Sequence, residues 1–174
     1  QNWQQLGLQG LAEVVARVDE DNNDVLLCQA MPKMAAVPRN VLLGFLENAT
    51  PGLNLTLAIS DSLAQVVADN ASAADLAAFA RGLSGSSSVP QRQQLLGAIL
   101  AHPEARSIEV LSAIGSRCWL DLSDERLQIY LEHLAAVGQD SFITLIADLM
   151  TLPSMRERIL AAFRTPERSD TLSA

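Results

Sequence analysis

The sequence predicts an all-α fold of about ten antiparallel helices, arranged as stacked helical hairpins. The first observation is composition, because 49% of the 174 residues are hydrophobic but only 4% are aromatic. Leucine and alanine dominate this hydrophobic fraction and favour helices, whereas β-branched and aromatic residues favour strands. The second is the three- and four-residue spacing of apolar side chains in most segments. The third is that helix starts from Pro90 onward recur roughly every 14–18 residues, as in two-helix repeats.

The first helix is expected over Trp3–Val18, where apolar residues form one face. It ends in the acidic run Asp19–Asp24, which resembles a calcium loop only at its first positions. The sixth position is Asp24 instead of glycine and the twelfth is Ala30 instead of glutamate, so no calcium site is predicted. We expect a loop whose Asp or Asn side chain caps a second short helix, Val25–Met31.

Prolines and a capping pattern divide the middle of the chain. Pro32 and Pro38 bracket a connector, because proline suits a first helical turn but not a helix interior. Ser72 followed by Asp75 has the spacing of a capping box in which Asp replaces Glu. The helices predicted in this part of the chain are Val41–Leu46, Leu53–Asn70 and Ala73–Leu83.

The segment Ser84–Ser88, SGSSS, is the one low-complexity stretch and is typical of a mobile loop. It predicts two helical halves packed on each other within a single domain over residues 1–164. Pro90 opens the next helix, which stops before Pro103 because the residue preceding a proline is disfavoured in the α region. Residues 165–174 are polar and lack periodicity, so we expect a frayed tail.

The stretch Ser107–Leu122 is predicted to be a core helix that runs into a tight elbow. Gly115 offers a point where a neighbouring helix can approach closely, and Trp119 is interpreted as a buried wedge at the elbow. The buried face of this helix is predicted to consist of Ile108, Leu111, Ile114 and Cys118.

Caps and breakers also place the last three helices. Ser123 is the expected N-cap of one helix, and acidic residues follow in its first turn, where they complement the helix dipole. Gly138 is expected to end that helix, and Asp140 or Ser141 to cap the next one. Pro153 breaks it. The last apolar stripe consists of Met155, Ile159, Leu160 and Phe163.

Two arrangements of these helices are open at this point. Helix pairs recur at about the length of known two-helix repeats, which favours a HEAT- or armadillo-like solenoid. No residue type recurs at a fixed offset, however, so an irregular α-bundle is the alternative.

Charge and composition narrow the class of partner. A formal net charge of -8 and a pI of about 4.6 argue against nucleic acid and anionic membrane surfaces as partners. No apolar run reaches the roughly 18 residues of a membrane span, and no signal peptide is visible, so we expect a cytoplasmic protein. Cys28 and Cys118 lie far apart without a Cys/His cluster, which predicts buried thiols and neither a disulfide nor a zinc site.

Few residues are suited to acid–base chemistry. The two histidines, His102 and His133, are each isolated from other candidate catalytic groups. Asp121 and Asp124 flank a helix start and are interpreted as caps. No phosphate-binding loop or hydrolase motif occurs. The sequence therefore predicts no catalytic residue, no metal site and no cofactor, and it favours a non-enzymatic role.

The favoured function is a scaffold that binds an extended or helical segment of a protein partner. Its preferred contact surface, for an acidic peptide, is the cluster of Arg156, Arg158, Arg164 and Arg168. One alternative is a small-ligand or regulatory site in a cleft near Arg117, Cys118 and Trp119. In that site Arg117 could lower the thiol pKa, although burial of Cys118 against the indole is the more economical interpretation. Another alternative is a homodimerisation module.

Two stretches carry a resemblance to a known family: Ile108–Leu122, IEVLSAIGSRCWLDL, and Leu152–Arg164, LPSMRERILAAFR. They resemble the C-terminal, all-helical half of an uncharacterised family of cytoplasmic proteins from Pseudomonas-like and Vibrio-like gammaproteobacteria. The resemblance implies a longer parent protein with a separate N-terminal part. It implies no known activity and no catalytic residues.

Overall fold

The structure is a computed structural model that describes residues 7–164. Within them it contains ten α-helices, three short 3-10 helices and no strand, so the predicted all-α class is confirmed. The predicted helix start at Trp3 and the predicted tail over residues 165–174 lie outside the described residues. The elements are α1 (Gly7–Ala16), α2 (Asn23–Ala30), η2 (Met31–Lys33), α3 (Ala36–Leu46), α4 (Leu53–Ala68), α5 (Ala73–Ser84), α6 (Val89–Leu100), η3 (Pro103–Arg106), α7 (Ile108–Arg117), η4 (Trp119–Asp121), α8 (Asp124–Val137), α9 (Gln139–Met150) and α10 (Met155–Ala162).

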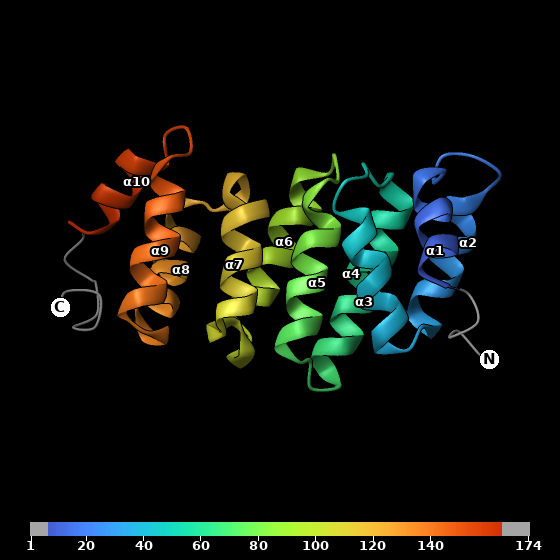
Figure 1. The fold of residues 1–174 in the computed structure, drawn as a ribbon, viewed down its shortest axis with the longest axis horizontal. Coiled ribbons are helices and arrows are strands. Elements are labelled where there is room, and N and C mark those ends of the chain that lie inside the picture. The colour runs from blue at the N-terminus through green and yellow to red at the C-terminus, as the bar shows by residue number, and fades with distance from the viewer. Residues whose placement is uncertain (1–6, 165–174) are drawn as a thin grey trace.

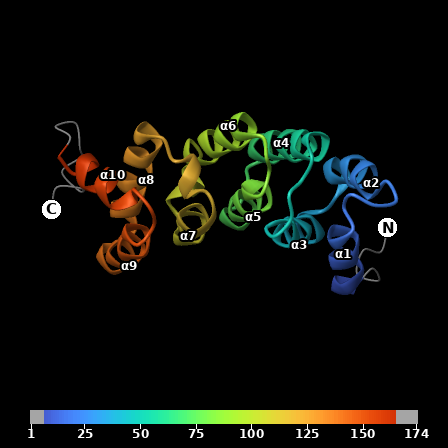
Figure 2. The same cartoon turned by 90° about the horizontal axis from the view of Figure 1, so that it is seen from above.

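The helices stand side by side in one elongated row, with α1 and α10 at opposite ends (Figure 1). Seen from above, the odd-numbered helices α1 to α9 form one layer and the even-numbered helices α2 to α8 form the other (Figure 2). The contacts follow this alternation, because α3 packs on α1 and α5, α7 packs on α5 and α9, and α4 packs on α2 and α6. α10 leaves the alternation and packs on both α8 and α9.

Packing is tightest around α5, in the middle of the row. The four residues Ala77–Ala80 are at most 4% exposed, because helices of both layers surround α5. Gly82 lets α3 approach α5 closely, because it has no side chain. A Cβ at this position would lie only 3.1 Å from Leu43 Cα. The large side chain on this helix is Phe79, and the Arg39 guanidinium of α3 lies 5.4 Å from the centroid of its ring.

A buried polar cluster joins α3 to α5. Arg39 Nη2 donates to Asp75 Oδ1 at 2.6 Å, and Asn40 Nδ2 donates to the same oxygen at 3.0 Å. Asp75 Oδ2 accepts from the hydroxyl and the backbone N–H of Ser72, which completes the predicted capping box of α5. Burial opposes ionisation of Asp75, but the hydrogen bonds from Ser72, Asn40 and Arg39 prevail and lower its pKa. One local cap therefore also anchors a pair of helices.

The segment predicted as a loop, Ser84–Ser88, begins with the last residue of α5 and is tied to its neighbours through buried Ser86. The Ser86 hydroxyl shares a hydrogen bond of 2.8 Å with the hydroxyl of Thr56 in α4, and it accepts the backbone N–H of Ser88 at 3.2 Å. Arg92 of α6 donates to the Ser86 carbonyl. The helices on either side, α5 and α6, also pack on each other. The predicted division into two halves at this loop stays a prediction.

Three helix starts differ from the sequence-based expectation. α3 begins two residues before Pro38, so this proline lies in the first helical turn, where its missing N–H costs nothing. α9 begins directly after Gly138, whose φ of 139° lets the chain turn from α8 without a linker, so neither Asp140 nor Ser141 is its cap. The predicted Asp or Asn cap of α2 is also wrong, because Asn22 is left-handed and makes no capping hydrogen bond.

Gly115 is the place where α8 approaches α7, as predicted. The Tyr130 hydroxyl of α8 donates to the carbonyl of Leu111 in α7 at 3.2 Å. A Cβ on Gly115 would lie 2.8 Å from the same hydroxyl oxygen, too close for the present packing. Tyr130 is fully buried, and its burial raises the pKa of the phenol, which keeps the hydroxyl a donor.

Candidate binding groove

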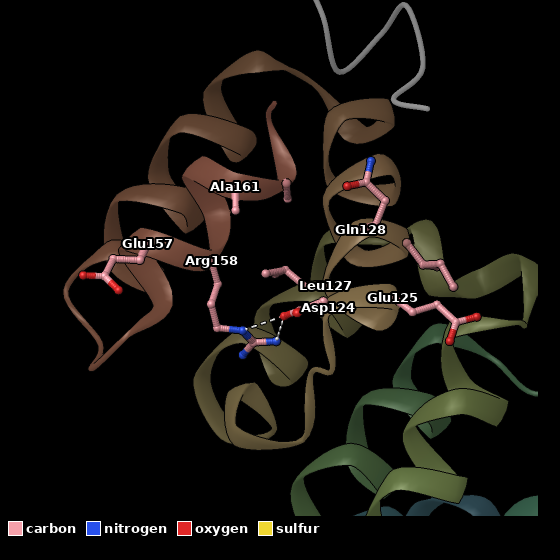
Figure 3. Close-up of a pocket in the computed structure, with 9 residues that line it drawn as sticks. Asp124, Glu125, Leu127, Gln128, Glu157, Arg158 and Ala161 are labelled. Atoms are coloured by element: carbon pink, nitrogen blue, oxygen red, sulfur yellow. Dashed lines mark hydrogen bonds and ion pairs between the residues drawn. The ribbon is translucent and has the colours of Figure 1, made fainter. Parts of the chain in front are cut away.

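A groove of about 780 Å³ opens between α8 and α10, near the C-terminal end of the helix row (Figure 3). Its volume is in the range of sites that accommodate ligands. The α8 side of the groove comes from the first two turns of that helix, and the other side comes from α10. The lining residues are Asp124, Glu125, Leu127, Gln128, Ile129, Glu157, Arg158, Ala161 and Ala162.

The N-cap of α8 positions one wall of the groove. Ser123 Oγ accepts the backbone N–H of Arg126 at 3.3 Å, which confirms the predicted cap. This places Asp124 and Glu125 in the first turn, where the positive end of the helix dipole stabilises their charge. The Asp124 side chain is 91% exposed, so this wall presents its carboxylate to solvent.

Arg158 reaches from α10 to the start of α8 and closes one end of the groove (Figure 3). Its Nε donates to Asp124 Oδ1 at 3.0 Å, and its Nη2 lies 2.9 Å from the same oxygen. Nη2 also donates to the Leu122 carbonyl in the segment that precedes α8. Nη1 lies 3.5 Å from Met155 Sδ. The guanidinium is therefore held within the chain, where it fixes α10 against α8.

The floor of the groove is apolar. Leu127 belongs to the buried core, whereas Ile129 is 38% exposed and offers an unburied aliphatic surface. From α10 the floor receives only alanine side chains, which leave the space open. Phe163, just beyond α10, packs against Phe142 of α9 with ring centroids 6.2 Å apart, so α10 is held from its other side. This arrangement favours the binding of apolar side chains from another molecule.

The rim of the groove is acidic. Asp124, Glu125 and Glu157 contribute three carboxylates, and Arg158 is the only cation that lines the groove, which gives the lining a formal charge of about −2. Glu125 and Glu157 form no ion pair with any residue in the described part of the chain. The groove thus combines an apolar floor with negative charge that is only partly compensated.

Of the four arginines predicted to bind a partner, the two that belong to α10 do not share one face of that helix. Arg156 and Arg158 are two residues apart, which separates them by about 200° around the helix axis. Arg156 and Arg164 are exposed and do not line the groove, whereas Arg158 is engaged by Asp124. Arg168 lies outside the described residues. Binding of an acidic peptide by this cluster stays a prediction.

The second predicted site, near Cys118, is a packed part of the interior. Cys118 is 6% exposed, and its thiol donates to the Ala80 carbonyl of α5 at 3.4 Å. Burial raises the pKa of this thiol to about 12; the Asp121 carboxylate adds to the rise, and the Arg92 guanidinium opposes it. The thiol is therefore protonated at neutral pH. None of the grooves described here is lined by Cys118.

Two neighbours of this cysteine differ from the sequence-based interpretation. Arg117 does not act on the thiol, because its guanidinium pairs with Glu47 at the end of α3. Trp119 is half-buried against the core, so the predicted wedge is only partly enclosed. Ile108 is 42% exposed and does not join the predicted buried face, because it is the first residue of α7 and lies at its solvated end.

Asp121 makes a contact that sequence reasoning missed. Its Oδ2 accepts from Arg92 Nε at 2.7 Å and its Oδ1 accepts from Arg92 Nη2 at 3.0 Å. This bidentate bridge ties α6 to the elbow between α7 and α8, and it raises the pKa of Arg92. The interpretation of Asp121 as a cap is wrong. No local signal could have found the pair, because its members are 29 residues apart.

The two histidines lie outside the groove between α8 and α10. His102 Nδ1 accepts the backbone N–H of Glu104 at 3.2 Å, so this residue caps η3 instead of completing the end of α6. His133 is half-buried, and burial, followed by the nearby Arg106, lowers its pKa, which favours the neutral ring. Neither side chain lines the groove between α8 and α10.

Two smaller grooves lie between helices of the odd-numbered layer. One of about 450 Å³ separates α1 from α3, and one of about 270 Å³ separates α7 from α9. Across residues 7–164, no group of three or more His, Cys, Asp or Glu side chains is placed to hold a metal ion. The helices in the same range are too short or too polar to cross a membrane.

Comparison with known proteins identifies a family. No curated protein and no solved structure shows a significant match to the sequence. A family model described as a protein of unknown function, DUF3549, matches residues 1–174. This confirms the predicted membership of an uncharacterised family. The chain therefore belongs to the DUF3549 family.

Proposed function

We propose that this domain is a non-enzymatic α-solenoid scaffold that binds an extended or helical segment of a protein partner in the cytoplasm. The observation that carries the proposal is the groove between α8 and α10, which has a volume of about 780 Å³ and an apolar floor. The two-layered row of helices supports it, because stacked hairpins present long continuous surfaces built on rigid elements.

The environments of the most reactive groups also favour binding over catalysis. The Cys118 thiol is buried and protonated, and the Arg92–Asp121 bridge beside it joins α6 to η4. His133 is isolated from the groove. Cys118 and the Arg92–Asp121 bridge belong to the packed interior, so the residues left at the surface of the groove are those that recognise shape and charge.

The proposal is tested by photo-cross-linking in the cells that produce the protein. A benzophenone amino acid replaces Ile129, whose side chain is 38% exposed in the groove. We expect a discrete adduct with one other polypeptide after irradiation. The matched control carries the same amino acid at Leu57 of α4, which is 39% exposed but does not line the groove.

The outcomes separate the possibilities. An adduct from Ile129 that is absent from Leu57 supports partner binding in the groove. Absence of any adduct at Ile129, with the variant folded and present at native abundance, would overturn the proposal. An adduct of twice the mass of the chain itself would indicate homodimerisation, and would replace the scaffold function with the dimerisation alternative.

A further inference from the structure

We propose that the groove between α8 and α10 receives a basic amphipathic helix of a protein partner, with an apolar face flanked by Lys or Arg residues. This inference rests on the proposed scaffold function and assigns the chemistry of the partner. It is carried by two properties of the same groove, the shape of its floor and the charge of its rim.

The shape fits a helix better than a flat surface. The groove runs between two helices, and its apolar lining consists of Leu127, Ile129 and the alanines of α10. Leu127 and Ile129 are two residues apart, so they border the groove from different faces of α8. A helix that docks in such a groove inserts side chains at positions i, i+3, i+4 and i+7. The alanines are essential to this fit, because they leave a space of about 780 Å³ for larger side chains of the partner.

The charge favours a cation over an anion. The carboxylates of Asp124, Glu125 and Glu157 outnumber the single Arg158 guanidinium. The N-terminus of α8 lies at the groove and contributes about half a positive charge, whereas residues from both ends of α10 line it, so the two ends of that helix dipole offset each other. The lining therefore keeps a net negative charge of about 1.5. The chain as a whole carries a charge of -8, which adds long-range attraction for a basic segment.

Two other possible occupants of the groove, residues 165–174 and a second copy of the chain, complement its negative charge less well. Residues 165–174 follow directly in the sequence and carry Glu167 and Asp170 against the single Arg168, so they have the same sign as the groove. A second copy of the chain also carries the charge of -8 and is repelled at low ionic strength. Complementarity therefore favours a basic partner.

The probe is a fluorescein-labelled helical peptide of about 14 residues made of Leu, Ala and Lys, with leucines at i, i+3, i+4 and i+7. Its binding to the full chain is followed by fluorescence anisotropy. We expect a Kd of roughly 10–100 µM that weakens with added salt. The same peptide with every Lys replaced by Glu is expected to bind at least about tenfold more weakly.

Matched variants distinguish binding that depends on the carboxylates of the groove from binding that depends only on the net charge of the protein. Glu125→Lys with Glu157→Lys should weaken the Lys peptide at least about tenfold. Asp61→Lys with Asp69→Lys makes the same change in net charge on exposed positions of α4 and its C-terminus, and should change the Kd less than about twofold. Ile129→Ser should weaken binding, whereas Leu57→Ser, at a position of equal exposure, should not.

Several results would overturn the assignment. One is equal binding of the Glu peptide, and another is equal weakening by the two charge-reversal pairs, because the attraction would then be non-specific. Displacement of the probe by a synthetic peptide of residues 165–174 would assign the groove to the chain's own C-terminal segment. Loss of probe binding in step with dimer formation, followed by light scattering, would assign it to a second copy.

The test also distinguishes this inference from the proposed function. If Ile129 cross-links to a partner but the Lys peptide does not bind, the scaffold function stands and the basic chemistry is overturned. If the Lys peptide binds in the groove but no partner cross-links, the chemistry of the groove stands and the scaffold function fails.

Discussion

Two arginine–aspartate bridges in this molecule differ in their exposure to water. In the elbow bridge, the side chains of Arg92 and Asp121 are 16% and 5% exposed. In the groove bridge, those of Arg158 and Asp124 are 27% and 91% exposed. Both bridges connect a helix to the short region around the start of α8, and both use the Nε and Nη2 atoms of the arginine.

The comparison separates a bridge that belongs to the core of the fold from one that lies at the wall of the groove. The elbow bridge engages both oxygens of Asp121 away from water, so removing one partner leaves the other charge buried and unpaired. The groove bridge engages one oxygen of Asp124, and water can solvate what is lost. We therefore expect the elbow bridge to behave as a rigid part of the core and the groove bridge to contribute less to stability.

The largest effect should appear at the thiol beside the elbow bridge. In a Cys28→Ala background, we expect an aromatic disulfide to modify Cys118 about 10³-fold more slowly in the native state than in urea, because modification requires opening of the core. The pKa of about 12 slows the reaction further. Rapid modification of the native protein would contradict the rigid elbow and would favour the cleft near Cys118 and Trp119.

Asp121→Asn should lower the free energy of unfolding by about 3–5 kcal/mol, because Arg92 would keep its charge in a largely buried position. Urea unfolding followed by circular dichroism measures this loss. The double variant Arg92→Met with Asp121→Asn should recover part of the stability, since it removes the unpaired charge. A loss below about 1 kcal/mol for the single variant would show that the elbow bridge behaves as a surface contact.

Gly115→Ala should lower the free energy of unfolding by about 1–3 kcal/mol, because the new methyl group displaces the Tyr130 hydroxyl from its bond to Leu111. Gly97→Ala is the matched control in α6, where the nearest atom is Arg126 Nε at 3.8 Å. There we expect a gain of about 0.5–1 kcal/mol from helix propensity. Urea unfolding measures both changes in the free energy of unfolding. If the two changes had the same sign, the close approach of α8 to α7 would be contradicted.

The smallest effect is expected for Asp124→Asn in the groove bridge. Its side chain is 91% exposed, so the loss in the free energy of unfolding should be below about 1 kcal/mol in the same urea experiment. A loss as large as that of Asp121→Asn would remove the contrast between the two bridges. It would also indicate that the wall of the groove is structural.

Most of the helices could be predicted from the sequence, but the contacts between them could not. Ser72 and Ser123 were identified as N-caps from their spacing to the first turn, and the structure confirms both. Gly138 marks the end of α8 as predicted, and its positive φ also starts α9, which spacing alone did not indicate. The errors at Asp121 and Arg117 share one cause, because in each case a plausible local role was replaced by a partner in another helix.

For the candidate groove too, the helices could be predicted from the sequence but the contact between them could not. Sequence placed Asp124 and Glu125 in the first turn of one helix and Arg158 in another, but it gave no measure of which face of each helix would meet. A sequence separation of 34 positions between Asp124 and Arg158 allows many separations in space. Only the docking of α10 on α8 and α9 brings Arg158 to the end of a groove that has an apolar lining and an acidic rim.

By itself, the sequence determined the all-α class, the order of the helices and the caps at Ser72 and Ser123, because hydrophobic periodicity and capping act within one or two turns of chain. The tertiary structure alone decided that Cys118 packs against α5, that Asp121 binds Arg92, and that α8 and α10 enclose a groove. These contacts join residues far apart in the chain. Their geometry depends on how whole helices dock, and no residue spacing encodes that arrangement.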